Sequence, residues 1–199
     1  MKSTFLSYIL LHGEYDKRRG EIDVFEAIKG RRSCRRFLPE AIGNDVIETI
    51  LEAAVWAPFP ANQQSWEFIV IRDKGVIGKI YSHAEVCKKI LFEKSGWKWI
   101  DTYSLSVLRE VPVIIAVVGD PEKTGADRFL EGGGLGYHHA CAAAIQNMLL
   151  AAHELGLGTL CDTLFDQDVT REILGIDLSK ETIAMICLGK TDVDSVQTP

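Results

Sequence analysis

The chain has 199 residues, of which 47% are hydrophobic and 25% are charged. These fractions are ordinary for a folded globular domain, and they exclude a disordered, collagenous or coiled-coil protein. The 22 Lys and Arg residues stand against 28 Asp and Glu residues, which gives a formal net charge of −6 and argues against a nucleic-acid partner.

The cysteines and the apolar runs indicate a cellular location. The chain has five cysteines, an odd number, and no C-x-x-C pair, so we expect reduced thiols and a cytoplasmic protein. Apolar runs such as residues 111–118 are far shorter than the roughly 20 residues that span a bilayer, so we expect no membrane partner. Residues 5–11 imitate a short signal peptide, but no small-residue cleavage site follows them.

Hydrophobic periodicity predicts helices interspersed with strands. In chain order we expect helices over residues 21–29 and 44–56, a strand over 66–71, helices over 73–93 and 100–109, a strand over 111–118, a helix over 137–155, a strand over 157–164, a helix over 168–174 and a strand over 182–188. Asn44 is the expected N-cap of the second helix. This order indicates an α+β fold, with residues 1–20 as an N-terminal extension and 21–199 as a single domain.

A dense basic turn follows the first predicted helix. Residues 29–36 (KGRRSCRR) hold five cations in eight positions. A guanidinium can bind a phosphate through two hydrogen bonds, and the Ser33 hydroxyl can donate a third. The turn is therefore a candidate phosphate cradle, although a solvated surface turn is the commoner meaning of such a charge run.

Three other segments could bind a ligand. The loop at residues 57–66 (APFPANQQSW) combines two prolines with Asn62, Gln63 and Gln64, and its amides suit the edge of a heterocycle; the alternative is a rigid surface turn. Residues 131–136 (EGGGLG) only weakly resemble a phosphate-binding glycine loop. His138 and Cys141 share a helix face, but no further ligand cluster follows, so we expect no metal.

Taken together, four segments resemble the nitroreductase family of FMN enzymes. They are residues 31–37 (RRSCRRF), 54–66 (AVWAPFPANQQSW), 149–160 (LLAAHELGLGTL) and the Leu-Gly-Ile at 174–176 before the strand that ends at Leu188-Gly189. The resemblance covers about residues 22–190. It implies a nitroreductase-like fold, with a mostly antiparallel central sheet flanked by helices. It also implies a homodimer that binds two FMN molecules at the subunit interface.

The resemblance also implies which residues bind the cofactor. Arg31, Arg32 and Ser33 match positions that hold the FMN phosphate and ribityl chain. Arg35 matches a cationic position near the pyrimidine end of the flavin, where negative charge develops on reduction. The loop that the partner subunit supplies is matched by Pro58, Phe59, Asn62 and Gln64. The segment whose backbone amides approach flavin N5 is matched by Thr163 and Leu164. Lys190 is the one lysine available where relatives carry a basic C-terminal segment.

The implied activity is that of an FMN-dependent NAD(P)H oxidoreductase. Hydride would pass from NAD(P)H to flavin N5 and then, in a ping-pong cycle, to an electron-poor acceptor such as a nitroaromatic or a quinone. The flavin carries this chemistry, so no side chain is expected to be catalytic. Two alternatives stay open: a dehalogenase-like or flavin-fragmenting enzyme with residues 93–103 as a lid, and a flavin-binding redox sensor without turnover.

One observation from the sequence itself supports a dimer. The predicted helix at residues 137–155 is rich in alanine and apolar around much of its circumference. This is more apolar surface than one sheet face needs, so part of the helix is expected to pack against a second subunit. The alternative is a helix buried within a single chain.

Overall fold

A four-stranded antiparallel sheet forms the centre of the computed structural model, which describes residues 23–192. The strands are β1 (Trp66–Ile71), β2 (Val113–Gly119), β3 (Gly158–Asp162) and β4 (Glu181–Gly189). Their order is β1-β2-β4-β3, and each neighbouring pair is antiparallel. The predicted antiparallel sheet is confirmed, whereas the extension expected over residues 1–20 lies outside the described residues.

The central strand β2 is buried along its whole length, as its unbroken apolar sequence predicts. Its side chains alternate between two hydrophobic cores. Val113, Ile115 and Val117 point into one core, while Ile114 and Ala116 point into the other. The sheet therefore needs helices on both faces.

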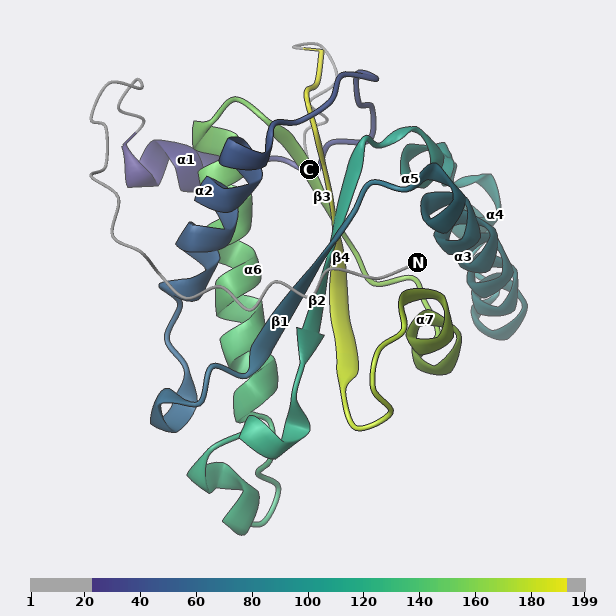
Figure 1. The fold of residues 1–199 in the computed structure, drawn as a ribbon. Coiled ribbons are helices and arrows are strands. Elements are labelled where there is room, and N and C mark those ends of the chain that lie inside the picture. The colour runs from purple at the N-terminus through teal and green to yellow at the C-terminus, as the bar shows by residue number, and fades with distance from the viewer. Residues whose placement is uncertain (1–22, 193–199) are drawn as a thin grey trace.

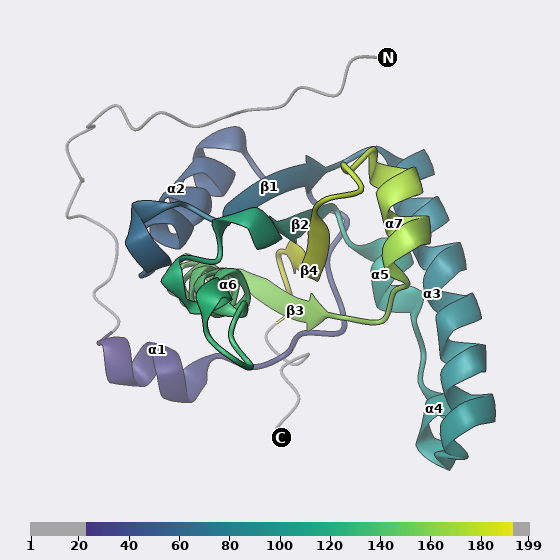
Figure 2. The ribbon, with the colours of Figure 1, turned by 90° about the horizontal axis from the view of Figure 1, so that it is seen from below.

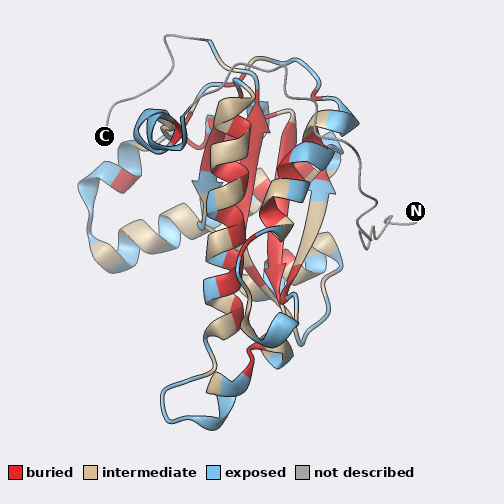
Figure 3. Ribbon diagram, turned by 90° about the vertical axis from the view of Figure 1, so that its left-hand side faces the viewer, coloured by how far each residue is buried: buried red, intermediate tan, exposed pale blue. Residues whose placement is uncertain are grey.

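Helices cover the two faces of the sheet (Figures 1 and 2). On one face lie α2 (Asn44–Val55) and α6 (Gly136–Glu154), with α1 (Val24–Gly30) beside α6. On the other lie α3 (Lys74–Ser95), α5 (Ser106–Glu110) and α7 (Gln167–Leu174). Buried residues concentrate on the sheet and on the helix faces that meet it (Figure 3).

The long helix α6 is buried by its own chain over much of its surface. Ala144 and Ala152 are fully buried, and these small residues let α2 pack closely against α6. Between them, α2, α1 and the sheet account for much of the apolar circumference that the sequence shows. The apolar character of this helix therefore does not by itself call for a second subunit.

Two local predictions are wrong. The helix expected over residues 100–109 is two short helices, α4 (Lys98–Thr102) and α5. The break follows from Ser104, whose hydroxyl accepts a hydrogen bond from the Ser106 N–H and so competes with helical backbone bonding. Asn44 is not an N-cap but the first helical residue, because Gly43 is the cap. The described residues contain seven α-helices, where five or six helices were expected.

Candidate functional site

The basic turn is tied to the edge of the sheet by its backbone. Ser33 forms a parallel bridge with Thr159 of β3, and the Cys34 N–H donates to the Thr159 carbonyl at 2.8 Å. Cys34 is 3% exposed, so its side chain anchors the turn in the core. Because side chains alternate along extended backbone, burying Cys34 turns Ser33 and Arg35 outward.

The turn forms one wall of a cleft of about 1020 Å³. This volume is at the upper end of the range for small-molecule sites. Four of the predicted cofactor residues line the cleft together: Arg31, Arg32, Ser33 and Arg35. The residues expected at the phosphate and the arginine expected at the pyrimidine end of the flavin therefore line the same cleft.

The cations of the turn differ in their surroundings. The Arg32 guanidinium donates to the carbonyls of Lys29 and Arg31, the latter at 2.9 Å, so it stabilises the turn itself. Burial lowers the pKa of His153, and the charges of Arg31 and Arg32 lower it further. His153 is therefore neutral at pH 7, and it adds no charge to the cradle.

The rest of the cleft lining is mixed, because two aromatic rings stand beside three hydroxyl side chains and a carboxylate: Thr102, Ser104, Ser106 and Glu110. Trp99 and Tyr103, from α4 and the residue that follows it, line the cleft, and Trp97 stacks on Trp99 with ring centroids 6.1 Å apart. From the sequence, residues 93–103 are expected only as a lid, and Trp99 and Tyr103 are not among the predicted site residues. The sequence feature that could have indicated these aromatic cleft residues is the presence of two tryptophans and a tyrosine within residues 97–103.

The loop with the predicted amides lies elsewhere, beyond the far end of α2 from the basic turn (Figure 1). The lining of the cleft includes none of the four residues predicted from this loop: Pro58, Phe59, Asn62 and Gln64. The Phe59 ring packs edge-on against Trp66, with centroids 5.1 Å apart. Within one chain, the structure does not bring this loop to the basic turn.

The backbone of this loop is strained. Ala61, Asn62 and Gln64 have φ values of 49°, 57° and 45°, in the left-handed region that residues with a Cβ atom rarely occupy. Such strain persists where surrounding contacts impose it, and it clusters at ligand sites.

Thr163 and Leu164 directly follow β3, the strand to which the basic turn is bridged. Arg31 is close enough to this strand to lower the pKa of Cys161, although burial and Asp162 raise it more strongly. The Leu164 N–H donates to the Asp162 carboxyl at 3.3 Å. Burial raises the pKa of Asp162, while hydrogen bonds from Leu164 and Thr163 lower it.

Lys190 lies apart from the cleft. It forms an exposed ion pair with Glu40, with the Nζ and Oε2 atoms 2.5 Å apart, and it does not line the cleft. A phosphate contact from Lys190 would require this pair to open.

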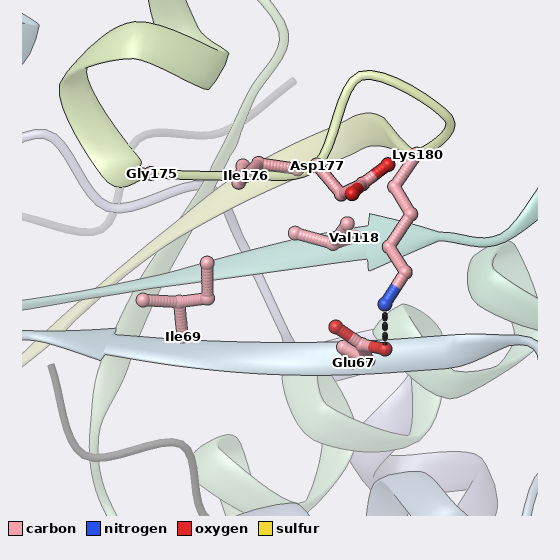
Figure 4. Close-up of a pocket in the computed structure, with 7 residues that line it drawn as sticks. All are labelled: Glu67, Ile69, Val118, Gly175, Ile176, Asp177 and Lys180. Atoms are coloured by element: carbon pink, nitrogen blue, oxygen red, sulfur yellow. Dashed lines mark hydrogen bonds and ion pairs between the residues drawn. The ribbon is translucent and has the colours of Figure 1, made fainter.

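A second hollow, of about 310 Å³, lies over β1 and β2 beside the turn that follows α7 (Figure 4). The ion pair between Lys180 and Glu67 lies at one side of it, and Ile69 and Val118 also line it. It contains none of the predicted site residues, and its cation is already paired with a carboxylate. We therefore place the candidate site at the basic cleft.

The residues that looked metal-like have other roles. His138 lies 3.4 Å from the carboxylate of Glu181, and burial raises the pKa of Cys141 to about 12. Among residues 23–192, no group of three or more His, Cys, Asp or Glu side chains is placed to hold a metal ion. In the same range, no helix is long and apolar enough to cross a membrane.

A basic cleft with two aromatic rings in its lining lies at the edge of a helix-flanked antiparallel sheet, and its cations and rings suit a flat, anionic ligand. The nitroreductase family profile matches residues 28–190, and the chain belongs to the nitroreductase family. It is 30% identical over 145 residues, 73% of its length, to a "Putative NADH dehydrogenase/NAD(P)H nitroreductase" of Methanothermobacter thermautotrophicus. The chain spans 63% of that relative's length.

Solved structures share this fold. A "putative nitroreductase in complex with FMN" from Desulfovibrio desulfuricans is 29% identical, with a TM-score of 0.68 over 90% of this chain and 92% of that one. An oxidized iodotyrosine deiodinase bound to FMN and 3-iodo-L-tyrosine is 21% identical, with a TM-score of 0.76 over 89% of this chain and 94% of that one. The nitroreductase-like fold expected from the sequence is thus confirmed.

Proposed function

We propose that this protein is an FMN-dependent oxidoreductase that takes electrons from NAD(P)H. The observation that carries the proposal is the convergence of Arg31, Ser33 and Arg35 in one large cleft beside β3. FMN combines a phosphate with a flat ring system, and the lining of this cleft offers both cations and two aromatic rings, Trp99 and Tyr103. The FMN-bound family member at 29% identity supports the same assignment.

The chain's own residues would bind and orient the cofactor. Arg31 and Ser33 would hold the phosphate and ribityl chain, and Arg32 would keep the turn in shape. Arg35 would stabilise negative charge at the pyrimidine end. Bound FMN would supply the redox chemistry, carrying electrons from NAD(P)H to an electron-poor acceptor such as a nitroaromatic or a quinone.

Backbone amides after β3 would complete this side of the cofactor site. Thr163 and Leu164 are the proposed contacts near flavin N5. Because the Leu164 N–H is bonded to Asp162 in the chain alone, cofactor binding would have to share or replace this bond. Lys190 would contribute only if its pair with Glu40 opened.

A homodimer would bring the remaining predicted residues to the site. Pro58, Phe59, Asn62 and Gln64 lie away from the cleft of their own chain, so they would serve the FMN of a partner subunit. Sedimentation across a dilution series, with flavin fluorescence followed in parallel, tests this proposal. Loss of FMN affinity on dissociation is expected, and a monomer that keeps FMN at full affinity would overturn the shared site.

A dehalogenase-like or flavin-fragmenting enzyme of the same fold is the second candidate. The aromatic rings of Trp99 and Tyr103 favour it, because such rings can stack on an aromatic substrate. The deiodinase of similar fold binds 3-iodo-L-tyrosine.

The visible spectrum of the purified protein, after incubation with FMN and removal of the excess, tests the proposed function. We expect flavin absorbance, release of FMN on denaturation, and anaerobic bleaching by NADH or NADPH. Reoxidation by a quinone or nitroaromatic supports the first candidate, and reoxidation only by a halogenated phenol supports the second. Bleaching without turnover of any acceptor indicates a redox sensor, and a colourless protein that cannot be reconstituted refutes all three.

A further inference from the structure

Arg35 has a specific partner among the other residues that line the cleft. Its Nε–H donates to the hydroxyl of Tyr103 at 3.3 Å, between residues 68 positions apart in the chain. The guanidinium carbon lies 5.9 Å from the centre of the Tyr103 ring, at the outer limit of a cation–π contact. Of the two contacts from Tyr103, the hydrogen bond of its hydroxyl is therefore the one that can orient the guanidinium.

Tyr103 is itself held in place by its own segment. Its N–H donates to the Ile100 carbonyl at 3.1 Å, and Ile100 is 2% exposed, so the backbone is anchored in the core. The Tyr103 ring meets Trp99 edge-on, with centroids 6.1 Å apart and an interplanar angle of 85°. Its hydroxyl is thus a hydrogen-bond acceptor at a fixed position.

We propose that Tyr103 is a positioning residue that sets the reduction potential of bound FMN by orienting Arg35. A hydrogen bond at Nε fixes the plane of a guanidinium, and that plane decides where its two terminal nitrogens point. A guanidinium held toward developing negative charge stabilises it without reorganisation, whereas one that swings freely stabilises it less. Tyr103 thereby stabilises reduced FMN more than oxidised FMN, although it bears no charge.

This inference rests on the proposed function, because it concerns the FMN that Arg35 is proposed to contact. It adds a residue whose effect on the potential is indirect. A role in packing alone would change protein stability and leave the potential unchanged. The potential of bound FMN therefore separates the two roles.

The test compares Tyr103→Phe with the wild-type protein, both loaded with FMN. The change removes only the hydroxyl and keeps the ring against Trp99. We expect the preference for reduced over oxidised FMN to fall about three- to tenfold, which lowers the two-electron midpoint potential by about 15–30 mV. Trp99→Leu should shift the potential in the same direction, because it removes the ring that packs against Tyr103. Trp99 is 60% exposed.

Two controls test whether Tyr103 changes the reduction potential of FMN through Arg35. Tyr81 lies near Arg109 with a similar separation, 6.0 Å from the guanidinium carbon to the ring centre, but outside the cleft, so Tyr81→Phe should leave the potential unchanged. In an Arg35→Gln background, Tyr103→Phe should have no further effect on the potential.

Each outcome bears on the inference. An unchanged potential in FMN-loaded Tyr103→Phe overturns it, and so does an equal shift in the Arg35→Gln background. In both cases the proposed FMN site stands, because the wild-type protein has bound FMN. If the wild-type protein binds no FMN, the proposed function fails and this inference fails with it.

Discussion

Gly158→Ala tests whether the contact between β3 and the basic turn supports the cofactor site. Gly158 begins β3 opposite Gly189 of β4. A Cβ atom added at Gly158 would lie 2.9 Å from both Cβ and Sγ of Cys34, and 3.2 Å from Cβ of Thr191. Carbon atoms pack at about 3.5 Å or more, so Cys34 would have to move by about 0.6 Å. Overpacking of this kind destabilises a protein by about 1–3 kcal/mol.

The same displacement should reach the proposed cofactor residues, because Cys34 directly follows Ser33 and precedes Arg35. Charge-assisted hydrogen bonds contribute about 1.5–3 kcal/mol each, and losing about half of one such contact weakens binding about four- to tenfold. We therefore expect Gly158→Ala to lower the melting temperature by about 2–12 °C and to weaken FMN binding about four- to tenfold.

Thermal melting and flavin-fluorescence titration measure the two effects, with Gly78→Ala as the matched control. Gly78 lies inside α3, and a Cβ atom added there meets nothing within 4 Å. Alanine should stabilise that helix by up to about 1 kcal/mol without affecting FMN. Unchanged stability and FMN affinity in Gly158→Ala would refute the argument that the turn depends on the absence of a side chain at this position.

Two further predictions concern charged groups. Arg31→Ala should weaken FMN binding by about 1.5–3 kcal/mol, whereas Arg35→Ala should lower the FMN reduction potential; equal affinity losses with an unchanged potential would contradict this division of roles. Burial raises the pKa of Asp127, but hydrogen bonds from Gly136, Thr124 and two neighbouring amides outweigh burial and lower the pKa below 3.8. Its stabilisation is therefore present above pH 3.8 and is lost as the pH falls through the lowered pKa. Asp127→Asn should make stability less pH-dependent below pH 4 in urea denaturation, and an unaltered pH profile would show that these bonds do not stabilise the fold.

The sequence predicted the strands better than the helices that line the cleft. The strand Trp66–Ile71 begins and ends where expected, because a short run of β-branched and aromatic residues between polar loops favours a strand over a helix or a loop. The break between α4 and α5 was missed, because it follows from the hydrogen bond that Ser104 accepts from the Ser106 N–H. Periodicity along the chain does not encode such a contact.

The site was likewise only partly predictable. Arg31, Arg32, Ser33 and Arg35 are close in sequence, so one short turn was enough to bring them together. The placement of the two aromatic rings depends on the direction in which α4 leaves α3, which tertiary packing decides. The left-handed backbone at Ala61 was also not predicted, since alanine has no preference for that conformation.

The strained loop offers a test of the shared site that is independent of the basic turn. Ala61 and Gln64 have similar left-handed φ values, but only Gln64 carries an amide proposed to serve the partner's FMN. Glycine at either position relieves about 1–2 kcal/mol of backbone strain and loosens the unfolded chain by about 0.4–1 kcal/mol. Both Ala61→Gly and Gln64→Gly should therefore leave the unfolding free energy within about 1 kcal/mol of the wild type.

FMN affinity should separate these two variants. Because no hydrogen bond joins the Gln64 side chain to another residue in the part of the chain that the structure describes, its amide contributes little to the fold of a single chain. Gln64→Gly should weaken FMN binding by about 0.5–1.5 kcal/mol, the range for a neutral hydrogen bond, while Ala61→Gly should bind FMN as the wild type does. If both variants bind FMN as tightly as the wild type, Gln64 is not part of the cofactor site. If both variants lose affinity equally, the effect belongs to the backbone of the loop rather than to the amide of Gln64.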